Sequence, residues 1–320
     1  LEIPTLCHEA DMVTCREETM RRTPEERLHF QAEQQIARRH AALVRANKCL
    51  RCWYSPLKCI CTEVRPLAVP HEVIVLLHHK EYGRLSNTGK LIAASCPNST
   101  VFIAGIPEHE RLLREKLASS PHPAFVLFPA VGSISVPELL KRNPPADSDD
   151  ASIPPQKRAK VSEGQGAEDG QVRPFTIVIV DGTWNQAKHV VRAVPNDIPR
   201  VHVDPTAPSL FVLRTQTQPD RICTLEAFAL LLREMGHDVG LPQSLLSYLK
   251  HHVDTALEDR GCNSIYGNDD GDAEEEVAPG KPASIDRKAL KANKRKRNEE
   301  AIAARAAVAE AAAPSQGTSS

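Results

Sequence analysis

Short apolar runs alternate with amphipathic stretches through the middle of the chain. Runs of aliphatic and β-branched residues at 72–78, 100–105, 124–129, 175–180 and 200–203 predict buried strands. Residues 108–119, 223–235 and 241–257 carry a helical period, and another helix can begin at Trp184. Strands that alternate with helices in this way predict an α/β domain with a largely parallel sheet.

Ahead of these strands, the sequence predicts a helix from Thr23 to about Asn47. Thr23 stands at the N-cap, a proline takes the first helical position, and a glutamate follows three residues after the cap. Leu28, Ile36 and Leu43 fall on one side. The other faces carry arginines, namely Arg27, Arg38, Arg39 and Arg45. Both a solvated charged face and a phosphate-contacting face fit this pattern.

Composition and charge set the domain limits. The 320 residues hold 40 basic and 41 acidic side chains, so any nucleic-acid surface must be local. With 25 prolines and only 4% aromatic residues, much of the length is not packed core. We divide the chain into an uncertain segment (1–22), a helix with a cysteine loop (23–61), an α/β catalytic domain (62–140 and 175–258), a disordered insertion (141–174) and a disordered charged tail (259–320).

The absence of recognisable targeting segments predicts the cellular compartment of the protein. It shows no signal-peptide core and no long apolar span, which predicts an intracellular protein of the nucleus and/or cytoplasm, away from membranes. No protein partner is implied. The first residue is Leu1 rather than Met, which leaves open that an N-terminal piece is missing.

Four cysteines in one short loop predict a metal site. They are Cys49, Cys52, Cys59 and Cys61. Four thiolates form a tetrahedral S4 set that suits zinc or an iron–sulfur centre, whereas unligated thiols are not normally clustered in this way. Zinc would tie the preceding helix to the domain. Because the protein fills all four positions, we expect a structural site.

Polar motifs follow two of the predicted strands. Asp181-Gly182-Thr183-Trp184 comes after one strand, and the loop 79–90 comes after another. The carboxyl ends of strands in an open α/β sheet are where ligands bind. In the alternative interpretation, Asp181 only caps a helix and Trp184 only fills the core, which is the commoner place for tryptophan.

Four motifs in order resemble a known family. They are Cys49-x-Arg51-Cys52…Cys59-x-Cys61, His79-x-Glu81-x2-Arg84-x2-Asn87-Thr88-Gly89, Asp181-Gly182-Thr183-Trp184 and Thr224-Leu225-Glu226-Ala227. Over about residues 48–257, this series resembles the DTW-domain proteins, the tRNA-uridine aminocarboxypropyltransferases. Two departures are Cys223, where a serine is expected, and the insertion at 141–174.

The resemblance implies a reaction, a fold and a set of site residues. The reaction is transfer of the 3-amino-3-carboxypropyl group from S-adenosylmethionine to N3 of a tRNA uridine, with release of 5′-methylthioadenosine. The fold would be similar to the knotted SPOUT methyltransferases. Catalytic roles would fall to Asp181, Thr183 and Trp184. The donor site would be formed by His79, Glu81, Arg84, Asn87, Thr88, Arg214, Thr224 and Glu226.

The chemistry gives two of these residue types specific tasks. The imide N3–H of uracil must lose its proton, so we expect Asp181 to accept it or to hold the uracil edge. A guanidinium suits a carboxylate or a phosphate, so we expect Arg84 or Arg214 to pair with the donor's carboxylate or with RNA. Glu226 could equally be a first-turn residue favoured by the helix dipole.

Two other functions stay open on the sequence. A SPOUT-type RNA methyltransferase would release S-adenosylhomocysteine instead, and a non-catalytic, zinc-stabilised RNA-binding module would not consume the donor. For tRNA binding, the candidate basic surfaces are the arginines of the first helix, Arg51 beside the cysteine loop, and residues 294–297 in the tail.

Overall fold

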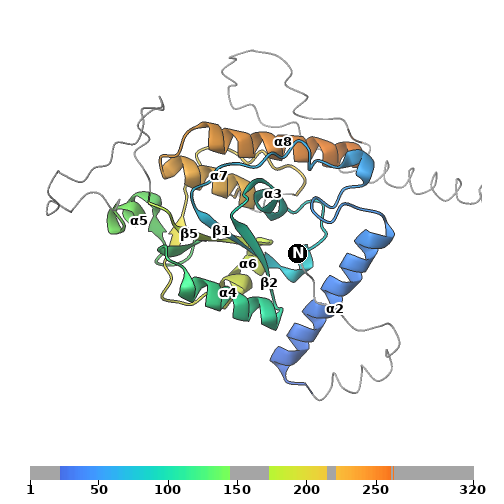
Figure 1. Ribbon diagram of the computed structural model, residues 1–320, viewed down its shortest axis with the longest axis horizontal. Coiled ribbons are helices and arrows are strands. Elements are labelled where there is room, and N and C mark those ends of the chain that lie inside the picture. Colours follow the sequence, from blue (N-terminus) through green and yellow to red (C-terminus); the bar gives the residue numbers. More distant parts are fainter. Residues whose placement is uncertain (1–21, 145–172, 215–220, 261, 263–320) are drawn as a thin grey trace, which may run out of the picture.

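The computed structural model describes residues 22–144, 173–214, 221–260 and 262. In this part of the chain, six parallel strands form one sheet in the order β2-β1-β5-β3-β6-β4 (Figure 1). Their bounds are β1 Glu72–His78, β2 Ser99–Ala104, β3 Ala124–Leu127, β4 Ile134–Ser135, β5 Thr176–Asp181 and β6 Arg200–His202. The prediction of an α/β fold with a parallel sheet is confirmed.

Seven α-helices accompany the sheet in the described residues. They are α2 Pro24–Arg45, α3 Gly89–Ser95, α4 Pro107–Ser119, α5 Val136–Arg142, α6 Trp184–Val190, α7 Thr224–Glu234 and α8 Gly240–Asp259. A 3₁₀ turn, η2 (His79–Glu81), directly follows β1. None of these helices combines the length and apolar character needed to cross a bilayer.

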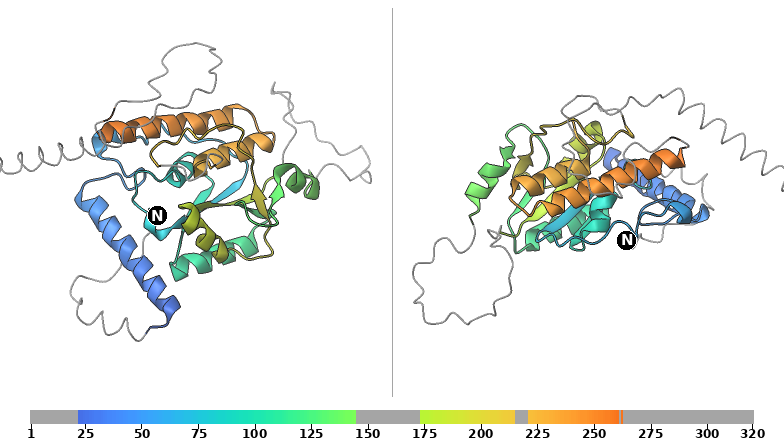
Figure 2. Two further views of the ribbon diagram at one scale, coloured as in Figure 1. Left: turned by 180° about the vertical axis from the view of Figure 1, so that it is seen from behind. Right: turned by 90° about the horizontal axis from the view of Figure 1, so that it is seen from above.

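Successive residues of the central strands point to opposite faces of the sheet. Val73 and Val75 of β1 belong to the core beneath α3, α7 and α8, whereas Ile74 and Leu76 belong to the core beneath α4 and α6. Figures 1 and 2 show the sheet between these two helical layers. Burial on both faces explains why the strands read as continuous apolar runs.

A crevice opens where the chain leaves β1 and β5. These strands are neighbours, and Leu77 lies opposite Asp181 in their register. The helix after β1 (α3) packs on one face and the helix after β5 (α6) on the other. In parallel sheets such a divergence creates the ligand-binding crevice at the carboxyl ends of the strands. Asp181, the last residue of β5, therefore lies at this crevice.

Helix α2 packs against the carboxyl-terminal part of the β1–β2 edge. The predicted capping box is present, since Thr23 Oγ1 accepts from Glu26 N (3.2 Å) and Glu26 Oε2 accepts from Thr23 N (2.7 Å). Ile36 and Leu43 are buried, as predicted. Leu28, which the sequence placed on the same side of the helix as Ile36 and Leu43, is 63% exposed. The buried residues of α2 lie further along the helix, so its first turns contribute none.

Some boundaries also differ from the prediction. Strand β4 and helix α5 were not predicted, because elements of two and seven residues are too short for a clear period. Lys141 and Arg142, assigned to the disordered insertion, are the last residues of α5. Residues 145–172 of that insertion, residues 1–21 and nearly all of the tail lie outside the described residues.

Candidate active site

A cavity of about 920 Å³ lies at the carboxyl edge of the sheet. The ends of β3, β5 and β6 contribute to its wall, as do the loop before α3 and the first turns of α6 and α7. This volume lies in the range of small-molecule and cofactor sites. Seven of the predicted site residues line the cavity, namely Asn87, Thr88, Asp181, Thr183, Trp184, Arg214 and Thr224.

The carboxylate of Asp181 is held from two sides in the cavity wall. The side chain is 3% exposed. Asn87 Nδ2 donates to Oδ2, and Thr224 Oγ1 donates to Oδ1 at 2.6 Å. Burial raises the pKa of Asp181, although the hydrogen bonds from Thr224 and Asn87 oppose this rise. Three motifs that are far apart in the sequence therefore meet at one carboxylate with an increased proton affinity.

Gly89 allows this carboxylate to reach its position. A Cβ atom added to Gly89 would lie 2.7 Å from both Cγ and Oδ2 of Asp181, closer than real Cβ contacts come. The backbone N–H of Lys90 donates to Asn87 Oδ1 (3.0 Å), which orients the Asn87 amide. The start of α3 thus fits closely around Asp181, and only glycine leaves enough room.

Thr183 and Trp184 have different roles. Thr183 caps α6, because its Oγ1 accepts from Gln186 N (3.4 Å) and its own N–H donates to Gln186 Oε1 (2.7 Å). Trp184 is only partly buried and lines the cavity, with the Arg221 guanidinium 4.6 Å from its ring centroid. The interpretation of Trp184 as a core residue was therefore wrong. Its ring contributes an aromatic surface to the site.

Glu81 anchors two arginines rather than facing the cavity. Its side chain has 0% exposure, and Arg84 Nη1 lies 3.1 Å from Oε1. Arg214 Nη2 pairs with Oε2, and Arg214 Nε donates to Ser86 Oγ at 3.0 Å. Arg214 lines the cavity, whereas Arg84 does not. A buried carboxylate needs such partners. Glu81 therefore holds the Arg214 guanidinium in place at the cavity, while Arg84 pairs with the other oxygen of Glu81.

Two more predicted donor-site residues lie away from the cavity wall. Glu226 accepts from the backbone N–H groups of Cys223 (2.7 Å) and Leu210 (2.6 Å), so it ties the loop before α7 to the start of that helix. The His79 ring stacks on His78 with centroids 4.2 Å apart. Neither residue lines the cavity, because the Glu226 carboxylate is directed at backbone N–H groups and the His79 ring at His78.

Other polar residues of the cavity were missed in the sequence. They include Ser86, Lys188, His202, Asp204, Arg221 and Cys223. His202 is the last residue of β6 and Asp204 follows it. Both therefore stand at the carboxyl end of a strand, which is the position that identified Asp181 as a candidate. Lys188 stands one helical turn after Trp184, on the same face of α6. No local signal distinguished Arg221.

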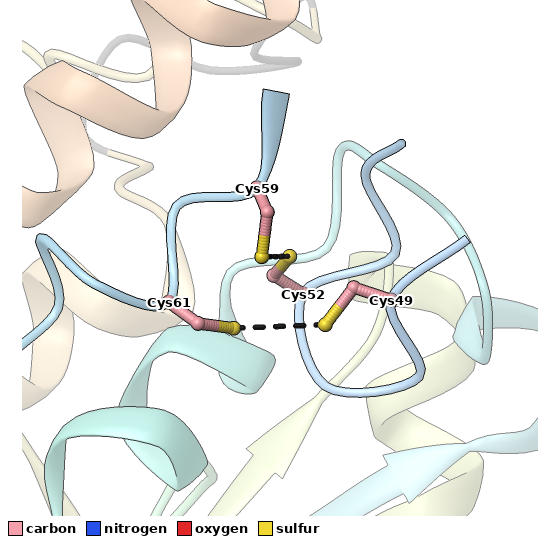
Figure 3. A group of neighbouring side chains, drawn as sticks. All are labelled: Cys49, Cys52, Cys59 and Cys61. Atoms are coloured by element: carbon pink, nitrogen blue, oxygen red, sulfur yellow. Dashed lines mark hydrogen bonds between the residues drawn. The ribbon is translucent and has the colours of Figure 1, made fainter. Parts of the chain in front are cut away.

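The four clustered cysteines converge as predicted. Their Sγ atoms all lie within 4.8 Å of one another, with Cys49–Cys61 at 3.7 Å and Cys52–Cys59 at 3.6 Å (Figure 3). A tetrahedral zinc ion with Zn–S bonds of about 2.3 Å requires sulfurs roughly 3.8 Å apart. These separations are far longer than a disulfide bond of about 2.05 Å. The set therefore fits one tetrahedral ion.

Backbone donors around the sulfurs also suit a metal site. Burial raises the pKa of Cys49, but N–H groups of Cys52 and Arg51 outweigh this effect and lower it to about 7. Burial raises the pKa of Cys52, although the Tyr54 and Ile60 N–H groups oppose this rise. Donors directed at sulfur stabilise the thiolate form that binds metal.

Comparisons with known proteins agree with this geometry. The DTW domain family matches residues 46–257. Mouse tRNA-uridine aminocarboxypropyltransferase 2 is 25% identical over 214 residues, covering 64% of this chain and 62% of the relative. A fruit-fly (Drosophila melanogaster) protein of the same name is 24% identical over 210 residues, covering 63% and 72% respectively.

The chain thus spans less than two thirds of the mouse relative's length. No solved structure matches it. The family match covers the sheet, the cysteine loop and every described cavity residue, and it ends inside α8. Taken with the convergence of the four motifs at the cysteine loop and the Asp181 cavity, this match shows that the chain belongs to the DTW domain family.

Proposed function

We propose that this protein transfers the 3-amino-3-carboxypropyl group from S-adenosylmethionine to N3 of a tRNA uridine. Membership of the DTW family and the names of its relatives support this function. The observation that carries the proposal is the buried Asp181 carboxylate in the wall of a cavity of about 920 Å³, which has the size of a small-molecule site.

Asp181 suits the deprotonation step. Uracil N3 attacks the donor's side-chain carbon next to sulfur, forming a C–N bond while the C–S bond breaks and its electron pair stays on sulfur. The N3 proton passes to Asp181, or Asp181 holds the uracil edge as the proton leaves. Each Asp181 oxygen accepts one hydrogen bond and keeps a second acceptor position. The raised pKa makes this carboxylate a stronger base than an exposed one.

Arg214 is our assignment for the donor's carboxylate. Its guanidinium lines the cavity and is anchored by Glu81 and Ser86, which leaves further N–H donors for a ligand. Arg84 offers a matched control because it pairs with the same glutamate outside the cavity. Arg214→Ala should weaken donor binding at least tenfold in calorimetry, whereas Arg84→Ala should change it less than threefold. Equal effects of the two variants would refute the assignment.

Two further parts of the proposal concern metal and topology. We assign the four-cysteine set to a structural zinc ion, because a multi-iron cluster would spread its cysteines over several irons and separate the sulfurs further. When bound, zinc would fix the loop between α2 and β1. The knotted SPOUT-like topology also remains a prediction.

The test is product analysis after incubation with S-adenosylmethionine and unmodified tRNA. Mass spectrometry should detect aminocarboxypropyl-uridine together with 5′-methylthioadenosine. Methyluridine with S-adenosylhomocysteine would instead assign a methyltransferase, and tRNA binding without any turnover would assign a binding module.

Two aspartates of the cavity provide matched variants. Asp181→Asn should slow transfer by more than tenfold with donor and tRNA binding intact. Asp204 lines the same cavity with 90% side-chain exposure, so Asp204→Asn should retain transfer within about threefold. A loss of less than tenfold in Asp181→Asn would remove Asp181 from the chemical step.

A further inference from the structure

Basic side chains gather beside the cavity, around the carboxyl end of β1. Lys80 belongs to η2, and Lys188 and His189 belong to α6; all three are exposed. Arg84 follows η2, and its side chain is 41% exposed. Arg39 of α2 extends the group along the sheet edge, where its Nη1 donates to the Tyr82 carbonyl at 3.1 Å. We call these five residues the basic band.

Contacts around His78 bring the parts of the band together. His78 ends β1 and stacks on His79 of η2. A Cβ atom placed on Gly182 would lie 3.4 Å from His78 Cβ, so the turn that leads into α6 touches the end of β1. The residue before His78, Leu77, is opposite Asp181 in the strand register. The basic band therefore begins immediately beside the carboxylate site.

His78 lies close enough to Lys80, His189 and Arg84 for these side chains to act on its titration. Burial is the main cause that lowers the pKa of His78 to about 4, and repulsion from His79, Lys80, His189 and Arg84 lowers it further. Burial lowers the pKa of Arg39, and Arg84 contributes in the same direction. The buried carboxylate of Glu81 already pairs with two arginines, so it does not present a free charge to solvent.

We propose that the basic band binds the phosphate backbone of the RNA next to the nucleotide that enters the cavity. A base that reacts in a pocket must leave its stack, so the flanking phosphates have to be held at the pocket's margin. Exposed lysine and arginine side chains on one edge provide such contacts. This inference rests on the proposed function for its ligand, and of the basic surfaces expected from the sequence it keeps only Arg39.

Those earlier candidates are less well placed. Arg51 donates through Nη2 to the Ala94 carbonyl at 2.8 Å, at the end of α3 remote from Asn87 and Asp181. Residues 294–297 lie outside the described part of the chain. Of the arginines on α2, Arg39 is the one whose guanidinium reaches the loop after β1.

The experiment measures tRNA affinity and its salt dependence for charge-matched double variants. Lys80→Ala/Lys188→Ala removes two cations from the band. Arg65→Ala/Arg233→Ala removes two exposed arginines elsewhere, one in the loop after the cysteines and one in the last turn of α7, and neither lines the cavity. Fluorescence anisotropy with labelled tRNA between 50 and 200 mM salt gives the affinity and the slope of its logarithm against that of salt concentration.

We expect the band variant to bind tRNA about tenfold more weakly. The salt slope of its affinity should fall in magnitude by roughly 1–2, because each lost phosphate contact reduces the number of counterions released when tRNA binds. The control variant should match the wild type, and Lys80→Arg/Lys188→Arg should restore affinity. Lys80→Ala alone should leave S-adenosylmethionine affinity unchanged, because Lys80 does not line the cavity.

Equal affinities and slopes for the band and control variants would overturn the inference, as would wild-type binding that does not depend on salt. Product analysis separates this result from the proposed function. If the band variant binds more weakly as expected but the wild type forms no aminocarboxypropyl-uridine, the phosphate-binding role of the band is supported and the proposed reaction is refuted. If product forms while the band variant binds normally, the reaction stands and the band is wrong.

Discussion

Gly89→Ala tests the close fit between α3 and the carboxylate of Asp181, the proposed base. The added methyl carbon would lie 2.7 Å from Cγ and Oδ2 of Asp181, and 3.1 Å from its Cβ. Asp181 is 3% exposed and accepts hydrogen bonds from Asn87 and Thr224, so any movement of its carboxylate would disturb both bonds. Either the carboxylate or the start of α3 must therefore shift by several tenths of an ångström.

The free-energy change is the difference between two effects. Overpacking of a buried site costs about 1–3 kcal/mol. Replacement of glycine by alanine in a helix stabilises the folded state by up to about 1 kcal/mol, because alanine has the higher helix propensity. We expect a net loss of about 1–2 kcal/mol, which lowers the melting temperature by roughly 2–8 °C for a domain of this size. Displacement of the proposed base should reduce the transfer rate by up to about 100-fold.

Gly240 provides the matched control. A Cβ atom there would also lie 2.7 Å from an aspartate oxygen, Asp238 Oδ1, but that side chain is exposed, and the bond that its Oδ1 accepts from Gly240 N (2.8 Å) can be replaced by water when it rotates. Gly240→Ala should therefore cost less than about 1 kcal/mol and leave transfer unchanged. Thermal denaturation and single-turnover transfer measure both variants. If Gly89→Ala keeps its melting temperature and its rate within twofold, the fit around Asp181 is looser than the structure indicates.

Two further predictions concern metal and pH. Metal analysis should find about one zinc ion per chain; Cys52→Ser should lose it together with several °C of thermal stability, whereas Cys262→Ser, outside the cluster, should retain it. Burial lowers the folded-state pKa of His71 to about 3, so between pH 6.5 and about 3 the unfolded chain binds a proton that the folded chain does not. Stability should therefore fall on acidification, by at most about 1.4 kcal/mol per pH unit for this group, and His71→Gln should flatten the dependence measured by denaturation between pH 5 and 7.5. Zinc retained by Cys52→Ser, or an unchanged pH slope in His71→Gln, would contradict the respective prediction.

The sequence predicted the meeting of Asn87, Asp181 and Thr224 only in part. Asn87 and Asp181 follow neighbouring buried strands, and parallel strands end at one edge of the sheet, so their proximity follows from the fold class. Thr224 reaches the same carboxylate from a helix 43 residues later in the chain.

Contacts that depend on the path of a loop were not predictable. The Glu81–Arg214 pair joins residues 133 positions apart, and nothing in the apolar pattern gives the course of residues 203–214. For that reason the sequence analysis placed Glu81, Arg84 and Arg214 together in the donor site and could not tell which of them faces the cavity. Trp184 shows a related limit. Composition favours a core position for tryptophan, but its place at the start of α6 puts the ring in the cavity wall.

The cysteine loop and the carboxylate site are connected through Lys90. Its side chain is 6% exposed, and its Nζ donates to the Leu85 carbonyl (3.0 Å) and lies 5.1 and 5.0 Å from the ring centroids of Trp53 and Tyr54, directly after Cys52. Its backbone N–H orients Asn87, which donates to Asp181.

Movement of the cysteine loop would therefore act on Lys90 and, through the start of α3, on the position of the Asn87 amide. The proposed structural metal, whose ligands lie 28 to 40 residues before the start of α3, can in this way influence a reaction in which it takes no part. Loss of zinc should then reduce transfer by displacing the Asn87–Asp181 pair, even at temperatures where the sheet itself remains folded.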